Sequence, residues 1–243
     1  MNQPIHNAYW LSRFESILNS ALAQHRAVSL IRVDLRFPEY MPATIMDTDL
    51  DSAVISRFFE SLKAKIQAYQ RKKRCANQRV HATSLRYFWC REFGGEKGRK
   101  HYHVILLLNK DTWCSLGDFS EPSSLATMIQ QAWCSALHLE SWQGNGLVHF
   151  SRRTPSRKPT SSDARPSSDV PSLPGGCSDT RKASGKKSGE VAVLWIKRGD
   201  VEAQQKARNR ASYLVKYETK QHDGSGQRNY GCSRGAGCLL DGR

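Results

Sequence analysis

The stretch SLRYFWCREFGGEKGRKHYHVILLLN, residues 84–109, decides the fold. Aromatic and apolar residues fill its two ends, 84–92 and 101–109, which is the composition of strands. The segment between them contains three glycines and is typical of a turn. The stretch therefore predicts a β-hairpin of about 25 residues.

Two histidines lie in the second strand of this hairpin. His101 and His103 project from the same face, because alternate residues of a strand do so, and both imidazoles can reach one cation. If residue 92 pairs with residue 101, Glu92 joins them at a cross-strand spacing of about 5 Å. Such a donor set predicts a site for Mg²⁺ or Mn²⁺, with zinc as an alternative. The alternative interpretation is that both are ordinary strand histidines and Glu92 is a solvated hairpin residue.

A second group of candidate residues lies in ARNRASYLVKYETK, residues 207–220. At 100° per residue of a helix, Tyr213, Lys216, Tyr217 and Lys220 share one arc, while the apolar residues of the segment face the other way. The tyrosines therefore share a face with lysines and lie away from the apolar seam. The alternative interpretation is that they are amphipathic residues at the edge of the core beside solvated lysines.

Tyrosines beside lysines have a chemical use if the substrate is a phosphodiester. Attack on a phosphate builds negative charge, which a divalent metal stabilises while it positions the phosphate. A tyrosine is a weak nucleophile at its ordinary pKa of about 10, and a neighbouring lysine or the metal favours the phenolate. The product would be a phosphotyrosine ester, which conserves the energy of the broken bond and makes strand cutting reversible.

The rest of the chain alternates between helical and extended patterns. Hydrophobic periodicity predicts helices over 9–25, 51–70, 121–138 (with Ser120 as its N-cap) and from Asp200 to about Lys220. Apolar patterning predicts further strands at 28–37, 146–150 and 190–197. Strands joined by a hairpin, with helices between them, predict an α+β fold with a central antiparallel sheet and flanking helices.

One segment lacks a folding signal. Residues 151–190 contain 10 Ser, 5 Pro and 9 Lys or Arg but almost no large apolar side chain. This composition predicts a disordered basic insert over 151–189. The glycine-rich tail, 222–243, is expected to be irregular. Residues 1–150 and 190–236 would then form a single domain.

The charge of the chain points to the class of partner. Its 37 Lys and Arg against 22 Asp and Glu give a net charge of +15, which favours nucleic acid. No run approaches the ~20 apolar residues that span a bilayer, there is no secretory signal, and seven cysteines indicate a reducing compartment. We therefore expect a nucleic-acid partner in a reducing compartment, with no membrane or small-molecule substrate. The basic residues expected to contact DNA are Arg32, Arg36, Arg71, Lys72, Lys73, Arg74 and Lys220.

The order of these motifs resembles the HUH endonuclease superfamily of rolling-circle replication initiators. The closest likeness is to the initiators of filamentous phages (inoviruses) and their prophage relatives. RVDLRFPEY (32–40) resembles the first motif of that family, and WCRE (89–92) with HYHV (101–104) resembles the second. YLVKYETK (213–220) resembles the third, and RNYGCSRG (228–235) resembles its frequent ending. The likeness covers most of 27–150 and 190–236, but not the basic insert.

The resemblance implies an activity and roles for the residues. His101, His103 and Glu92 would hold the metal, on the central strand of the sheet and its neighbour. Tyr213 would be the nucleophile that keeps the 5′ phosphate, Tyr217 would alternate with it, and Lys216 would neutralise the phosphate. The protein would nick and rejoin single-stranded or supercoiled DNA at a replication origin in the cytoplasm of a bacterial host, where a host helicase and polymerase would follow.

Two other kinds of protein remain open at this point. One is a non-enzymatic DNA-binding protein on a degenerate copy of the same fold, whose binding would be salt-sensitive but indifferent to metal. The other is a metal hydrolase without a covalent intermediate, in which the tyrosines would be dispensable.

Overall fold

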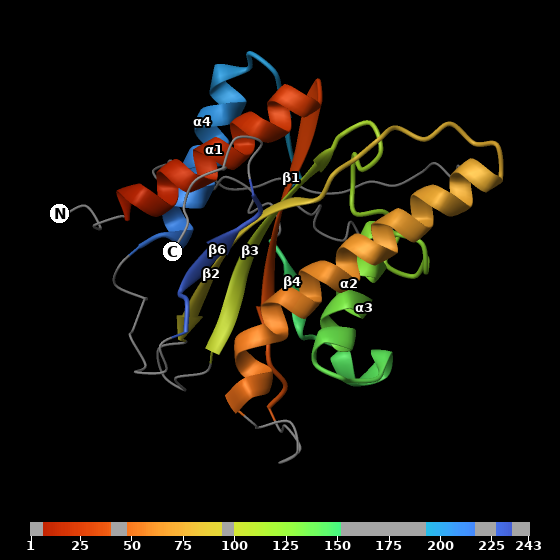
Figure 1. Ribbon diagram of the computed structural model, residues 1–243, viewed down its shortest axis with the longest axis vertical. Helices are drawn as coiled ribbons and strands as arrows, with labels where there is room; N and C mark the ends of the chain where they lie inside the picture. The colour runs from red at the N-terminus through yellow and green to blue at the C-terminus, as the bar shows by residue number, and fades with distance from the viewer. Residues whose placement is uncertain (1–6, 40–47, 94–99, 152–192, 217–226, 235–243) are drawn as a thin grey trace, which may run out of the picture.

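The computed structural model describes residues 7–39, 48–93, 100–151, 193–216 and 227–234 (Figure 1). The helices in these ranges are α1 (Ala8–Gln24), α2 (Thr48–Cys75), α3 (Leu125–Ala136), α4 (Val201–Leu214) and the short 3-10 helix η2 (Ser141–Gly144). The strands are β1 (Ala27–Arg36), β2 (Arg86–Phe93), β3 (Lys100–Asn109), β4 (Val148–Phe150), β5 (Leu194–Lys197) and β6 (Tyr230–Cys232). The predicted α+β fold with a central antiparallel sheet is confirmed.

The sheet is built around the predicted hairpin. β2 pairs antiparallel with β3, and β1 pairs antiparallel with the other side of β3. β6 extends the sheet beyond β2, while β4 and β5 pair with different halves of the outer edge of β1. The strand order is β4-β1-β3-β2-β6 with β5 also on β1, so β3, which carries both histidines, is the central strand.

Helices cover both faces of the sheet, α1 and α4 on one side and α2 and α3 on the other (Figure 1). The alternation within β1 explains this arrangement. Ile31, Val33 and Leu35 are buried against α2 and α3, while Val28 and Leu30 are buried against α1 and α4. β1 is therefore largely apolar on both faces along its first half, apart from the buried Ser29, and its charged residues begin only at Arg32.

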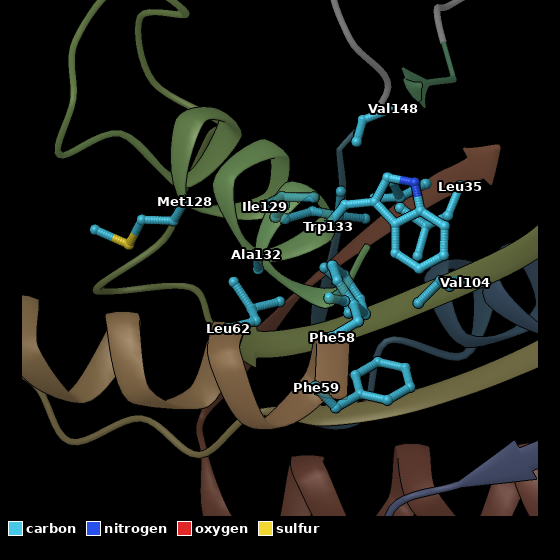
Figure 2. Close-up of a cluster of buried hydrophobic side chains, with 14 of the residues drawn as sticks. Leu35, Phe58, Phe59, Leu62, Val104, Met128, Ile129, Ala132, Trp133 and Val148 are labelled. Atoms are coloured by element: carbon cyan, nitrogen blue, oxygen red, sulfur yellow. The ribbon is translucent and has the colours of Figure 1, made fainter. Parts of the chain in front are cut away.

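Trp133 of α3 is fully buried between α2 and the sheet, next to Phe58 of α2 (Figure 2). A buried indole needs a partner for its N–H group. The Nε1 of Trp133 donates to the carbonyl oxygen of Arg36 at 2.7 Å. This hydrogen bond joins the α2 and α3 layer to the last residue of β1.

The N-cap of helix α3 lies four residues after Ser120, which is the predicted N-cap. The N-cap is Ser124, whose Oγ accepts a hydrogen bond from the backbone N–H of Thr127 at 3.1 Å. Ser120 instead donates its hydroxyl to Asp118, which also accepts the backbone N–H of Ser120. The Ser120 side chain is therefore occupied in a local turn, and the helix is capped by Ser124 instead.

Helix α4 begins after the N-cap Asp200, as predicted, but ends at Leu214 instead of near Lys220. Val215 leaves the helical conformation, and its carbonyl oxygen accepts the backbone N–H of Asn7, the N-cap of α1, at 3.1 Å. Leu214 and Val215 are both fully buried. The last turn of α4 is thus joined to the first turn of α1.

The prediction of an irregular tail is wrong for residues 230–232, which form β6. Arg91, buried in β2, holds the chain just before this strand. Its guanidinium donates to Oδ1 of Asn229 at 2.9 and 3.1 Å and to Oε1 of Gln227 at 2.7 Å. Charge-assisted hydrogen bonds of this kind are among the stronger ones in proteins. A buried arginine therefore fixes a segment whose own composition favours a loop.

Several predictions fall outside the described residues. The turn at 94–99, the insert from 152 to 189, and most of the tail belong to this group, as do Tyr217 and Lys220. Within the described ranges, no helix is both long enough and apolar enough to cross a membrane.

Replacing Gly231 with alanine should destabilise the protein by about 1–3 kcal/mol, because an added methyl group would overpack against a neighbouring ring. A Cβ at this position would lie 2.6 Å from Nε1 of Trp89 and within 2.8 Å of two further ring atoms. The free energy of unfolding in urea measures the effect. Arg234→Ala, at an exposed residue three positions along the chain, is the control. Equal stability of the Gly231 variant and the wild type would contradict this packing of β6.

Candidate metal centre

The register of the three central strands gathers polar residues at one end of the sheet. Glu92 and Arg36 both pair directly with His101, and Asp34 pairs directly with His103. Directly paired residues share a face, and this is the face covered by α1 and α4 further along. The structure supplies the pairing of residue 92 with residue 101 on which the grouping of Glu92 with the histidines depends.

Three ligand atoms converge on this face. The Nε2 atoms of His101 and His103 are 3.2 Å apart, and Oε2 of Glu92 lies 3.0 Å from Nε2 of His103 and 3.8 Å from Nε2 of His101. A point about 2.0 Å from all three atoms therefore exists, close to the ~2.0–2.2 Å of zinc or magnesium ligation. Within the described ranges, Glu92, His101 and His103 form the group of three His, Cys, Asp or Glu side chains that is close enough to hold one metal ion.

The donor set fits a divalent cation. One carboxylate oxygen and two imidazole nitrogens form a mixed N/O set, which suits Mn²⁺, Mg²⁺ or zinc. Glu92 and His103 are buried, and His101 is partly exposed, so the site opens to solvent on one side. The predicted grouping of Glu92, His101 and His103 is thus present in the fold.

Asp34 contacts His103 on the side of the imidazole ring that faces away from Glu92 and His101. Its Oδ1 lies 2.6 Å from Nδ1 of His103, which leaves Nε2 to face Glu92 and His101. A carboxylate on the far nitrogen fixes the tautomer and orientation of a ligating histidine. Asp34 faces the site and also pairs with an arginine, since Nε of Arg32 lies 3.3 Å from the same oxygen.

These contacts shift the ionisation of both residues. Burial alone would lower the pKa of His103, but hydrogen bonds and charge from Asp34 and Glu92 outweigh it and hold that pKa above its ordinary value. Burial alone would raise the pKa of Asp34, but His103 and Arg32 hold it below its ordinary value. Asp34 is therefore an anion at neutral pH, and His103 binds a proton readily when no metal is present.

Tyr213, in the last turn of α4, is connected to the triad through the side chain of Arg32. The guanidinium carbon of Arg32 is 5.2 Å from the centre of the Tyr213 ring, and an Nη of Arg32 is 3.3 Å from Nδ1 of His103. Nζ of Lys216 is 4.4 Å from the same ring. Tyr213 is 54% exposed, as predicted from its position away from the apolar seam of the helix. Two cations therefore contact an exposed tyrosine beside the candidate metal ligands.

The structure does not bring every predicted DNA contact to this site. Arg71, Lys72, Lys73 and Arg74 end helix α2, on the opposite face of the sheet. The same end of α2 packs through Tyr69 on Trp113, just beyond the Asn109 end of β3, whereas the histidines are at the other end of that strand. Arg36 is exposed beside His101. The basic end of α2 is thus separate from the metal centre.

Sequence reasoning missed a tyrosine next to the site. Tyr230 in β6 pairs directly with Cys90, which pairs with His103, so all three share the face of the triad. Burial, followed by a hydrogen bond with Tyr9, raises the pKa of Tyr230 to about 12. Tyr230 is thus a neutral phenol at physiological pH and a poor nucleophile. The resemblance marked the segment RNYGCSRG that contains it, but the composition of the tail favours a loop and gave no sign that this tyrosine lies in a strand beside the triad.

Comparison with known proteins identifies the family. Residues 1–162 match the family described as the YagK/YfjJ C-terminal domain. The chain belongs to this family. It is 30% identical to "Uncharacterized protein YagK" of Escherichia coli (strain K12) over 241 residues, which cover 95% of this chain and 94% of that protein. It is 31% identical to "Uncharacterized protein YfjJ" of the same strain, over 95% of this chain and 96% of that protein. The YagK/YfjJ match includes β1, β2 and β3, and with them Asp34 and the triad.

Asp34→Asn should weaken Mn²⁺ binding by about 10- to 100-fold, because the carboxylate that orients His103 and raises its basicity is lost. Isothermal titration calorimetry with Mn²⁺ alone measures the affinity. Asp200→Asn is a matched control, since it removes the same charge at the N-cap of α4, a position where asparagine also caps well. Equal affinities of the Asp34 variant and the wild type would contradict the supporting role of Asp34.

Mn²⁺ affinity should also increase with pH, because the metal must displace the proton that His103 holds. Since the pKa of His103 is raised, the increase should extend to higher pH than for a free imidazole and then level off. Calorimetry at steps between about pH 6 and pH 9 covers the range in which histidine titrates. Asp34→Asn should move the increase to lower pH. An affinity that is constant over this range would argue against His103 as a ligand.

Proposed function

We propose that this protein is a metal-dependent endonuclease of the HUH type, which nicks and rejoins single-stranded DNA through a 5′-phosphotyrosine intermediate and so starts rolling-circle replication. The observation that carries the proposal is the contact of Arg32 with both His103 and the Tyr213 ring. It links a candidate nucleophile on α4 to a metal-ligand triad far away in the sequence. The resemblance of the three ordered motifs to the inovirus-type initiators supports the same activity.

The residues divide the chemistry among them. His101, His103 and Glu92 would hold Mg²⁺ or Mn²⁺, which supplies charge stabilisation and alignment to the scissile phosphate. The Oη of Tyr213 would form a bond to phosphorus as the bond from phosphorus to the 3′ oxygen breaks. The phenol proton passes to water, and the 3′ oxygen takes a proton from water to become a hydroxyl that primes synthesis. Arg32 and Lys216 would neutralise the phosphate while it is transferred.

The charge of the chain supports a DNA substrate, since a net charge of +15 favours a polyanion. The substrate would be single-stranded or supercoiled DNA at the replication origin of a phage or mobile element in the bacterial cytoplasm. A host helicase and polymerase would extend the freed 3′ end. Tyr217, by the same resemblance, would carry out the second transfer that rejoins the strand.

Tyr213→Phe should reduce the formation of a covalent protein–DNA adduct by at least about a hundredfold, because it removes only the attacking oxygen. The assay uses fluorescent single-stranded oligonucleotides tiled across the DNA that flanks the gene, incubated with Mn²⁺ and resolved on denaturing gels. Chelation by EDTA and His101→Ala should abolish the adduct. Tyr69→Phe, the same chemical change on the opposite face of the sheet, should leave it unchanged.

Each other outcome points to a different protein. An adduct that persists in the Tyr213→Phe, Tyr217→Phe double variant would refute both tyrosines as nucleophiles. Metal-dependent cleavage without any adduct would indicate a metal hydrolase. DNA binding that is unaffected by EDTA, with neither cleavage nor adduct on any oligonucleotide, would leave a non-enzymatic binding protein.

A further inference from the structure

Three aromatic residues form a cluster where the start of α1 crosses β6. The rings of Trp10 and Tyr230 are stacked, with centroids 4.6 Å apart and planes at 26°. The ring of Tyr9 meets Tyr230 edge-on at 6.2 Å and 88°. The cluster therefore joins two consecutive residues of the first helix to the last strand of the sheet.

The cluster lies beside the metal centre. Cys90 pairs directly with His103 on one side and with Tyr230 on the other, so these residues form one row on one face. Neighbouring strands are about 4.8 Å apart, which places the Tyr230 backbone roughly 10 Å from that of His103. A stacked nucleic-acid strand advances about 3.4 Å per nucleotide. A strand with one phosphate at the metal could therefore reach the cluster within about three nucleotides.

Core packing accounts for only part of the cluster. Trp10 and Tyr230 pack against the buried residues under α1 and α4. Tyr9 lies outside this core and is 56% exposed. An exposed aromatic ring that is fixed by its neighbours is the feature on which unpaired bases stack, and each stacked base contributes about 1–3 kcal/mol.

The electrostatics of the cluster suit a nucleic acid. The phenol of Tyr230 is neutral at physiological pH, as tyrosines ordinarily are, so it does not repel phosphate. An Nη of Arg13, one turn further along α1, is 4.0 Å from Sγ of Cys232 in β6 and adds a guanidinium to the same surface. Aromatic rings combined with cations are how proteins bind single strands without reading a specific sequence.

The position of the cluster relative to Tyr213 also sets a direction for the strand. Arg32, which contacts Tyr213, is in β1 on one side of β3, and Tyr230 is in β6 on the other side. In phosphoryl transfer the attacking and leaving oxygens are roughly in line. If Tyr213 attacks from the β1 side, the leaving 3′ oxygen and the nucleotides attached to it lie on the β6 side, toward the aromatic cluster.

We infer that Tyr9, supported by Trp10 and Tyr230, is a stacking site for a base of single-stranded DNA on the 5′ side of the bond that is cut. This inference rests on the proposed function, because it takes single-stranded DNA as the substrate. It adds a contact that the triad and Tyr213 do not supply, and it assigns that contact to one side of the cleavage point.

Binding tests the stacking site without any catalysis. The probe is a fluorescein-labelled dT20 single strand in EDTA, followed by fluorescence anisotropy. Tyr9→Ala should weaken binding about tenfold, as expected for the loss of one stacked base, whereas Tyr9→Phe should stay within about twofold because it keeps the ring. The dependence of affinity on salt should not change, since no phosphate contact is removed.

The matched control is Trp142→Ala, which removes another exposed aromatic ring, 73% exposed and in η2 beside α3. It should bind dT20 like the wild type. Equal binding by Tyr9→Ala and the wild type would overturn the inference, as would an equal loss in the Tyr9 and Trp142 variants. Thermal unfolding of each variant shows whether it is folded before it is compared.

The direction of the strand is tested on an oligonucleotide that forms the covalent adduct. Single abasic positions are placed one at a time on either side of the cut. In the wild type, abasic positions within three nucleotides on the 5′ side should reduce adduct formation, and Tyr9→Ala should remove this sensitivity. Sensitivity on the 3′ side alone would overturn the assignment. If no oligonucleotide forms an adduct but Tyr9→Ala still weakens dT20 binding, the proposed nuclease fails and the stacking site stands.

Discussion

The antiparallel register of β1, β3 and β2 is the constraint on which the candidate site depends. It places Glu92 opposite His101 and Asp34 opposite His103. A slip of one residue in either pairing would send one partner to the opposite face of the sheet, into the core under α2 and α3. The register is held by apolar residues that occupy both faces of these strands further along, so the same packing that stabilises the sheet also aligns the ligand atoms.

The end of the sheet near His101 carries charges that a purely structural sheet would avoid. Glu92 and His103 are buried, and Asp34 is close behind them. Buried ionisable groups are costly unless they are paired. Here each has a partner, and the partners form a connected network from Glu92 through His103 and Asp34 to Arg32. A local concentration of polar groups within an apolar sheet is typical of a functional site.

The junction between α1 and α4 determines what surrounds this network. The hydrogen bond from Asn7 to Val215 joins the start of one helix to the end of the other. Tyr213 and Lys216 come from the α4 side of the junction, and Tyr9 and Trp10 come from the α1 side. Residues from opposite ends of the chain therefore come together on the side of the sheet that carries the candidate triad. In the proposed reaction, one side supplies the nucleophile and the other holds the strand that leaves.

The sequence by itself determined the two strands of the hairpin and the exposed face of Tyr213, and it grouped Glu92, His101 and His103 on the condition that residues 92 and 101 pair, because these follow from local periodicity. Only the tertiary structure decided the remainder: the end of α4 at Leu214, the strand β6, the second role of Asp34 and the approach of Arg32 to Tyr213. Each of these depends on contacts between residues far apart in the chain, such as the hydrogen bond that Arg91 donates to Asn229. Such contacts cannot be predicted from local composition, because they stabilise the protein only when the distant segments are packed together.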